Sequence, residues 1–314
     1  MELRQLRYFV KIVEIGSMGR AAVELELGTS ALSRQISSLE GELSTRLLQR
    51  TSTGIVPTAA GMAFLRQAQL TLRHANAAVE AAQDDRLSGQ LSVGLLPSTA
   101  SVLAMPLVLA MRDRYPGIRL RITEALSGSL AMMLSTRQLD LAIVAEGHAQ
   151  RKWDTTELLE EQLFVMGRAD LATMPTTDTM TLAQLAGMPL VLPSDTHALR
   201  QLVIGACQRA GVTPQITMEV DGLAVLMDVV ANGLGATVQP GCATVRWPAG
   251  DLRRIEILDT HVRRRNLLAS LPEDELSPPA LAGRVVLKDI IVSLVRAGKW
   301  PGARLLMQPT VDEA

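Results

Sequence analysis

The spacing of apolar residues predicts three short amphipathic helices at the start of the chain. The apolar positions of the first helix are Leu3, Leu6, Phe9, Val10 and Val13, and Gly16-Ser17 follows them as an expected helix end and cap. A second helix around Ala21 and Ala22 leads into a tight turn at Gly28, with Thr29 as the expected N-cap of the third helix. Two helices joined by so short a turn predict a helix-turn-helix.

The third predicted helix has two very different faces. Leu32, Ile36, Leu39 and Leu43 form one apolar stripe that must face a core. The opposite face carries small side chains and a single arginine: Ser30, Ser33, Arg34, Ser37 and Gly41. Such a face can enter a DNA major groove, where hydroxyl groups and a guanidinium can reach base edges. A solvent-facing amphipathic helix is the alternative for this window.

A turn with polar tips between residues 50 and 58 predicts a wing that could touch the DNA backbone or the minor groove. From residue 58 to residue 87, apolar residues recur at alternating spacings of three and four, at Leu65, Ala68, Leu72, Ala75 and Val79. This heptad seam predicts a dimerisation helix. The alternative is a helix that packs on its own domain.

After Ser88-Gly89, short apolar strands alternate with helical stretches, which predicts an α/β domain with a sheet rich in parallel pairs. Strands are expected near 91–96, 118–124, 140–145, 163–167, 189–192 and 216–220, and the segments 234–238 and 267–270 belong to the same domain. Helices are expected near 100–114, 128–139, 198–210, 222–232 and 279–296.

Three of these helices are expected to begin with Ser, Thr or His directly after a strand. In open α/β sheets, ligands bind outside the carboxyl ends of the strands, and helix N-termini attract anions. The candidate ligand residues are Ser98, Thr99, Ser127, Gly128, Thr196 and His197. Each one could equally be a plain N-cap, and Arg200 could pair with a carboxylate or lie on the surface. Taken together, they predict a small organic anion as the ligand, for instance a di- or tricarboxylate.

Charge gives little help to a DNA-binding interpretation, because the chain has a net charge of -1. Residues 1–90 hold ten Arg or Lys and nine Asp or Glu. DNA affinity must then come from dimerisation and from a few cations near the predicted face, which are Arg20, Arg34, Arg46 and Arg50.

Several protein classes are not indicated by the sequence. No apolar run approaches the length of a membrane span, and the N-terminus is too polar for a signal peptide, so a cytoplasmic protein is expected. The histidines His74, His148, His197 and His261 are scattered, so we expect no metal, no cofactor and no enzyme activity. Cys207 and Cys242 are expected to be buried thiols, with a redox-sensing pair as the alternative.

The first sixty residues resemble the winged helix-turn-helix of LysR-type transcriptional regulators. The matching residues are Leu3, Phe9, Gly16-Ser17, Ala21-Ala22, Leu25, the run from Ala31 to Ile36, Leu39-Glu40, Leu47-Leu48, Arg50, Gly54, Pro57-Thr58 and Ala60-Gly61. Two departures concern DNA contacts: Gly28-Thr29-Ser30 stands where the family usually has Ser-Gln-Pro, and Thr53 stands where it usually has a basic residue. The base preference of relatives is therefore not carried over. The opening residues are most similar to a subgroup that controls nitrogen assimilation or tricarballylate use.

The resemblance implies three parts. Residues 1–58 would form the DNA-binding domain, residues 59–88 a linker and dimerisation helix, and residues 89–314 an effector-binding domain of the periplasmic-binding-protein type. Its first lobe would span about 89–161 and 267–300, and its second lobe about 162–266, with the effector between them. The chain would then bind double-stranded promoter DNA as a homodimer or homotetramer. A solute-binding module without DNA function is the competing class.

The predicted DNA contacts follow from the same resemblance and from the geometry of the third helix. Base contacts are expected from Thr29, Ser30, Ser33 and Arg34, and Ser37 on the same face is also expected to contact DNA. Phosphate or wing contacts are expected from Arg20, Arg50 and Thr53.

Overall fold

A computed structural model of the chain divides into two compact units, one that holds Met1–Gly89 with Ser135–Gln138, and a second that holds Gln90–Leu134 and Leu139–Ala314. The structure describes residues 1–51, 54–83, 87–150, 153–247, 252–259 and 262–307. Within these ranges, none of the helices is both long and apolar enough to cross a membrane. Each unit has an apolar core of its own.

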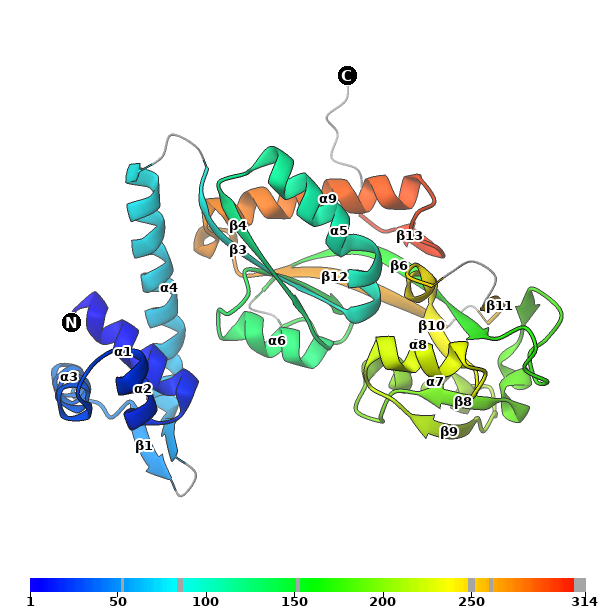
Figure 1. Cartoon of the computed structure of the whole chain (residues 1–314), viewed down its shortest axis with the longest axis horizontal. Coiled ribbons are helices and arrows are strands. Elements are labelled where there is room, and N and C mark those ends of the chain that lie inside the picture. The colour runs from blue at the N-terminus through cyan, green and yellow to red at the C-terminus, as the bar shows by residue number, and fades with distance from the viewer. Residues whose placement is uncertain (52–53, 84–86, 151–152, 248–251, 260–261, 308–314) are drawn as a thin grey trace. The chain divides into compact units, whose positions relative to one another are not determined.

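The first unit combines helices with one hairpin of strands (Figure 1). Its elements are α1 (Leu3–Ile15), α2 (Met18–Glu24), α3 (Thr29–Glu42), β1 (Leu48–Thr51), β2 (Gly54–Pro57) and α4 (Ala59–Gln83). Phe9 and Ile12 of α1 belong to the same buried core as Leu32, Ile36 and Leu39 of α3. The helix-turn-helix prediction is confirmed, and the predicted apolar stripes face this core except at Leu3, which is 44% exposed.

The ends of the short helices are set by local hydrogen bonds. Gly16 closes α1 in the left-handed conformation at φ 69°, and the Ser17 hydroxyl accepts a hydrogen bond from the Arg20 amide at the start of α2. The prediction that Thr29 caps α3 is wrong. Gly28 is the N-cap, and its carbonyl oxygen accepts the amides of Ala31 and Leu32, so Thr29 is the first helical residue.

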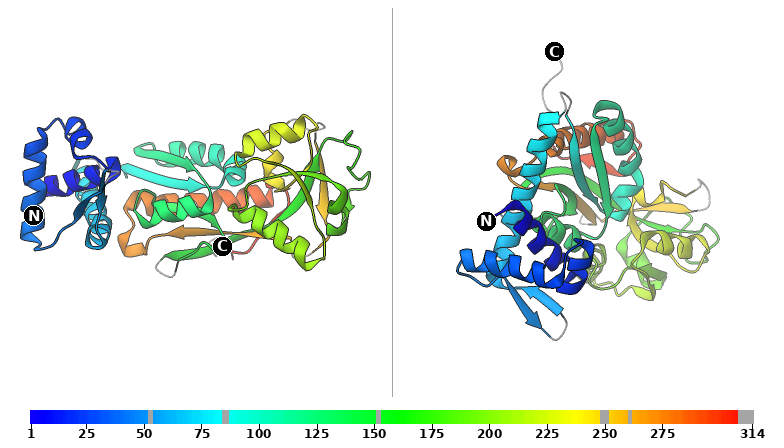
Figure 2. Two further views of the ribbon diagram at one scale, coloured as in Figure 1. Left: turned by 90° about the horizontal axis from the view of Figure 1, so that it is seen from below. Right: turned by 60° about the vertical axis from the view of Figure 1, so that its left-hand side comes forward.

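The β1–β2 hairpin forms the predicted wing and projects beyond the helices (Figure 1, Figure 2). The buried Glu40 carboxylate of α3 fixes its start, because Oε1 accepts the amides of Leu47 at 2.8 Å and Leu48 at 3.0 Å. Arg46 donates to the other carboxylate oxygen at 2.9 Å. The helix predicted to read DNA and the wing are therefore tied together by one side chain. Thr53 lies outside the described residues.

Helix α4 carries the predicted heptad seam, and its first part packs within the chain. Leu65 belongs to the core around Phe9, and Ala68 is buried as well. For these two residues the alternative interpretation holds, a helix that packs on its own domain, because the chain itself buries their side chains. Leu72 and Ala75 are half-buried, and the side chain of Val79 lies outside the described part of the chain.

The second unit is an α/β domain built on a large sheet. Its main elements are β3 (Gly89–Leu95), α5 (Pro97–Arg114), β4 (Ile118–Glu124), α6 (Ser127–Ser135), β5 (Leu141–Ala145), β6 (Asp154–Gly167), β7 (Thr179–Met180), β8 (Pro189–Leu192), α7 (Ala198–Arg209), β9 (Gln215–Glu219), α8 (Leu223–Ala231), β10 (Thr237–Pro240), β11 (Arg253–Ile257), β12 (Arg263–Ser270), α9 (Pro278–Arg296) and β13 (Ala303–Leu305). Short 3-10 helices occur at Leu182–Gly187 (η1), Gly241–Thr244 (η2) and Glu273–Glu275 (η3).

The sheet is mixed and not rich in parallel pairs as predicted. Among the described residues its strand order is β4-β3-β5-β12-β6-β11-β7, and β10 and β13 also pair with β6. Strand β6 is antiparallel to β10, β11, β12 and β13, whereas β3 and β5 are parallel. The local pattern predicted strands, but strand direction depends on pairings between distant segments.

The second unit has two lobes with separate cores. In the first lobe, Leu141 and Ile143 of β5 face the core shared with α5 and α9, while Ala142 and Val144 face the core shared with α6 (Figure 1). This alternation is what a strand covered on both faces requires. The second lobe packs α7 and α8 around β8 and β10 in two further cores.

Two long strands join the lobes. Leu158 and Leu159 of β6 lie in the core of the first lobe, whereas Leu163 and Val165 of the same strand lie in the core of the second. Strand β12 runs antiparallel beside β6, from the pair Arg263–Gln162 to the pair Ser270–Asp154. We call β6 and β12 the crossover strands.

A fully buried carboxylate lies on the crossover strands. Glu161 of β6 is 0% exposed and pairs with the guanidinium of Arg264 on β12 through Nε at 2.9 Å and through Nη2. It also accepts hydrogen bonds from the Asn266 amide at 2.7 Å, the Cys242 thiol at 3.0 Å and the Trp300 indole at 2.8 Å. Burial alone would raise the pKa of Glu161, but Arg264 and these donors outweigh burial and lower it.

Gly61 packs against the backbone at Leu47, just before the wing. It lies where α4 begins, and a Cβ at this position would overlap the carbonyl oxygen of Leu47. Gly61→Ala should lower the free energy of unfolding by about 1–3 kcal/mol, because α4 and the wing must move apart. Gly19→Ala in α2 is the control, since its Cβ meets nothing within 4 Å and alanine favours a helix by about 1 kcal/mol. Urea unfolding measures both changes, and equal stability of the two variants would contradict the prediction.

The neighbouring carboxylates Glu161 and Glu160 both pair with arginines, but only the arginine partner of Glu161 is buried. Glu161→Gln leaves Arg264 as a buried charge without a counterion and should cost about 3–5 kcal/mol of unfolding free energy. Glu160→Gln should cost about 1 kcal/mol or less, because its partners Arg263, Arg265 and Arg304 lie in contact with solvent. Chemical denaturation followed by tryptophan fluorescence compares the variants. A larger loss in Glu160→Gln would refute this ranking.

Candidate functional site

The outer face of α3 is exposed where the sequence predicts DNA contacts. Thr29, Ser30, Arg34 and Ser37 are exposed, and Ser33 is half-buried. Within the described residues, the Arg34 guanidinium has no ion-pair partner. The face therefore offers several short hydroxyl groups and one long cation to a partner surface.

Three further cations of the first unit differ in how firmly they are held. Arg20 donates to the carbonyl oxygen of Ile15 at 2.9 Å, which fixes its guanidinium beside the end of α1. Arg46 is 81% exposed but is anchored by buried Glu40. Arg50 of β1 is exposed, and it has no ion pair within the described segments. Arg34 and Arg50 are thus the cations most free to adapt to a nucleic acid.

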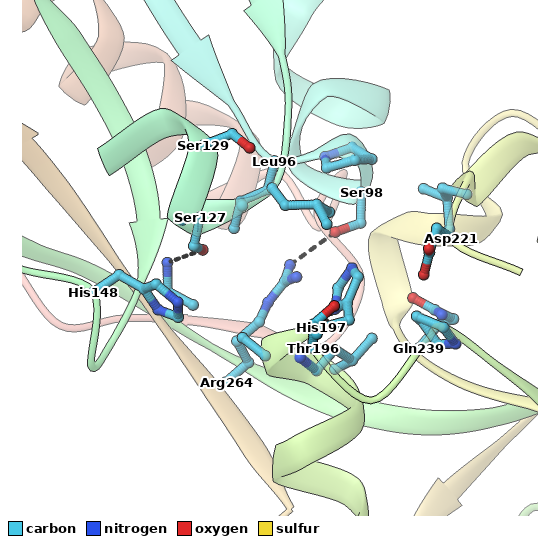
Figure 3. Close-up of a pocket in the computed structure, with 18 of the residues that line it drawn as sticks. Leu96, Ser98, Ser127, Ser129, His148, Thr196, His197, Asp221, Gln239 and Arg264 are labelled. Carbon is cyan, nitrogen blue, oxygen red and sulfur yellow. Dashed lines mark hydrogen bonds between the residues drawn. The ribbon is translucent and has the colours of Figure 1, made fainter. Parts of the chain in front are cut away.

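A cavity of about 300 Å³ opens between the two lobes of the second unit. Five predicted ligand residues line it together: Ser98, Ser127, Gly128, Thr196 and His197 (Figure 3). Thr99 does not line it and is 0% exposed, because consecutive helical side chains point about 100° apart. Its hydroxyl has no hydrogen-bond partner among the described residues. Arg200 does not line it either: its side chain is only 13% exposed, donates to the Pro193 carbonyl at 2.8 Å and pairs with the Glu219 carboxylate at 2.8 Å.

Ser129, in the predicted helix start Ser127-Gly128-Ser129, lines the cavity too. Four further polar residues of its lining were not predicted: His148, Asp221, Gln239 and Arg264. Arg264 is the middle of three consecutive arginines on a strand, so its side chain points away from those of its neighbours. Strand alternation in this basic run was the one signal that could have revealed it. Asp221 and Gln239 carry no local pattern that marks them.

The first lobe presents hydrogen-bond donors to the cavity. The Ser127 hydroxyl at the start of α6 accepts the Ala145 amide at 3.1 Å, which leaves its own hydrogen free to donate. Gly128 and Ser129 bring the first turn of α6 to the cavity wall, where helical N–H groups have no partner within the helix. Arg264 donates to Ser98 at 2.9 Å at the cavity floor. This wall suits a negatively charged group.

His197 adds a donor from the second lobe. It is the N-cap of α7, and its Nδ1 accepts the Leu199 amide at 3.1 Å. The neutral ring must then carry its hydrogen on Nε2. Burial and the charge of Arg264 lower the pKa of His197, although Asp221 opposes this shift. At neutral pH the ring is therefore an uncharged donor.

The two cysteines are buried and unbridged, and they belong to different cores. Cys207 lies in the second lobe, whereas Cys242 donates to Glu161. Burial raises the pKa of both thiols, and for Cys242 the Glu161 carboxylate raises it further. Neither environment favours a reactive thiolate.

Comparisons with known proteins cover both units. Residues 3–62 match the bacterial regulatory helix-turn-helix protein family, lysR type, and residues 84–288 match the LysR substrate binding domain. The chain is 36% identical over 299 residues to the nitrogen assimilation regulatory protein nac of Escherichia coli, covering 94% of this chain and 97% of that protein.

Solved structures agree with this result. A variant of full-length OxyR from Pseudomonas aeruginosa is similar, with a TM-score of 0.74 and 26% identity, covering 98% of this chain and 99% of that one. Full-length CbnR in complex with its target DNA has a TM-score of 0.63 at 24% identity, covering 93% of this chain and 100% of that one, which supports the fold alone. These relatives are regulators and not enzymes. The chain belongs to the LysR family of bacterial transcriptional regulators.

Proposed function

We propose that this regulator reads promoter DNA with the outer face of α3 and responds to a small organic anion in the cavity between its lobes. The observation that carries the DNA half is the exposed hydroxyl and Arg34 face, held rigid by the buried Leu32, Ile36 and Leu39. Thr29, Ser30, Ser33, Arg34 and Ser37 would face the groove, while Arg20, Arg50 and Thr53 would approach the backbone.

A homodimer, or a tetramer built from dimers, fits this mode of reading. One recognition helix covers about half a site, so a palindromic operator needs two copies. The described half-exposed seam residues Leu72 and Ala75, continued by Val79, are our candidates for helix pairing. CbnR, which shares the fold, has been crystallised with its target DNA. Binding of the anion would favour one arrangement of the lobes and thereby one spacing of the DNA-binding units.

The effector we propose has one carboxylate, which contacts the cavity wall at the start of α6. The sequence had suggested an effector with two or three carboxylates. The observation that supports a single carboxylate is the charge of the lining. Arg264 already shares its guanidinium with Glu161, and Asp221 adds a negative charge on the opposite wall. Two or three carboxylates would meet too few cations and one like charge.

The DNA half is tested with Arg34→Ala and Arg50→Ala on an operator selected from genomic DNA. Arg34→Ala should lose about 1–3 kcal/mol of specific binding and should discriminate less between operator and mutated sites. Arg50→Ala should weaken binding to all sequences and reduce the salt dependence by about one phosphate contact. Fluorescence anisotropy at several salt concentrations measures both effects.

Arg296→Ala is the matched control, because this arginine lies in the last turn of α9, outside the first unit. It should leave DNA binding unchanged. If Arg34→Ala keeps full specific affinity and discrimination, α3 does not read bases through this residue. If the wild-type protein binds no operator DNA, the alternative of a ligand-binding module without DNA function holds instead.

The effector half is tested by adding a charge at the α6 end of the cavity. Ser129→Glu places an acid in the first turn of a helix, where it is compatible with folding, but it should repel an anion and weaken its binding by about tenfold. Ser129→Gln is the neutral control of the same shape and should bind as the wild type does. Calorimetry with mono-, di- and tricarboxylates measures the affinities. An anion that binds to Ser129→Glu as tightly as to Ser129→Gln does not bind at the α6 end of the cavity.

A further inference from the structure

The wall of the cavity opposite α6 has a different chemistry. Asp221 and Gln239 lie next to each other there, across the cavity from Ser127 and Ser129 (Figure 3). Gln239 is only 3% exposed, yet no other described residue forms a hydrogen bond with its amide. Because the side chain lines the cavity, its amide is available to a group that enters there.

Asp221 places a negative charge beside that amide. Its Oδ1 accepts the Ser194 amide at 2.8 Å, and that hydrogen bond lowers the pKa of the carboxyl, so it is ionised at neutral pH. Within the described residues, no Lys or Arg forms an ion pair with it. The carboxylate keeps free acceptor positions on the side of the cavity.

The two sides of the cavity thus differ. The side of α6 carries Arg264, the Ser127 hydroxyl and the first turn of the helix, all of which donate. The opposite side carries the exposed Asp221 carboxylate and the Gln239 amide oxygen, both of which accept. Leucine side chains also line the cavity: Leu96, Leu126, Leu223 and Leu226. An anion without a positive group would meet the donors and leave the acceptors to solvent.

We propose that the effector is a zwitterion, an amino acid or amino carboxylate that directs its carboxylate to the α6 wall and its ammonium group to Asp221 and Gln239. This inference rests on the proposed function, because it specifies the chemistry of the same anion. An ammonium group supplies three donors and a positive charge, which match the two carboxylate oxygens of Asp221 and the Gln239 amide oxygen. A hydroxyl group would supply one donor and no charge.

Two series of ligands test the proposal on the full-length protein. Straight-chain carboxylates of two to six carbons are each compared with the 2-amino and the ω-amino derivative of the same length. Calorimetry should find at least one amino derivative that binds about tenfold or more tightly than its parent acid, as a charged hydrogen-bonded pair allows. The same derivative should change the affinity of the protein for its operator, whereas the parent acid should not.

Variants at the acceptor end locate the preference. Asp221→Asn keeps an acceptor for the Ser194 amide but removes the charge, so the amino derivative should lose its advantage over the parent acid. Gln239→Met removes the amide at similar size and should weaken the amino derivative more than the parent acid. Asp228→Asn is the matched control on the exposed side of α8, outside the cavity, and should leave both affinities unchanged.

The outcomes separate this inference from the proposed function. Parent acids that bind as tightly as their amino derivatives, or an amino preference that survives Asp221→Asn, would overturn the zwitterion. If neither series binds, the zwitterion proposal is overturned too. In that case the proposed function still stands if some other anion binds the wild type and is repelled by Ser129→Glu. If no anion passes that test, the proposed function fails too.

Discussion

The buried ion pair between Arg264 and Glu161 is the interaction on which the second unit depends. Removing two charges from water costs several kcal/mol each, so such a pair is tolerated only where further hydrogen bonds complete it. Here Asn266, Cys242 and Trp300 all donate to the same carboxylate. Side chains from both crossover strands, from η2 and from the segment before β13 therefore converge on one point where the strands join the lobes.

The same pair determines what the cavity can bind. Arg264 extends from the pair to Ser98, so the floor of the cavity offers a directed donor whose charge is already balanced by Glu161. Any surplus of positive charge for a ligand must then come from helix α6, whose N-terminus carries only a partial charge. A cavity of this kind selects by the positions of its donors and acceptors rather than by net charge. This is why the acceptors on the opposite wall matter for the class of effector.

Local sequence patterns predicted the elements well and their long-range pairing less well. Residues 118–124 and 189–192 were predicted with the bounds of β4 and β8, because turns and apolar runs mark both ends. The first half of β6 was missed, since Asp154-Thr155-Thr156-Glu157 is polar and becomes a strand only by pairing with β12. Residues at predicted helix starts lined the cavity, whereas Arg264 and Gln239 come from strands whose role depends on the distant partner beside them.

A buried carboxylate also joins separate segments in the first unit. The near-neutral charge of this unit provides little general attraction to DNA, so affinity must come from exact placement of a few groups. Glu40 supplies that placement, because one buried carboxylate joins α3 to the amides at the start of the wing. In the proposed DNA contact, the Gly28-Thr29-Ser30 opening of α3 would set which side chains reach the bases. Since Gly28 is the cap, the Thr29 hydroxyl is not used to cap the helix and remains available to a partner.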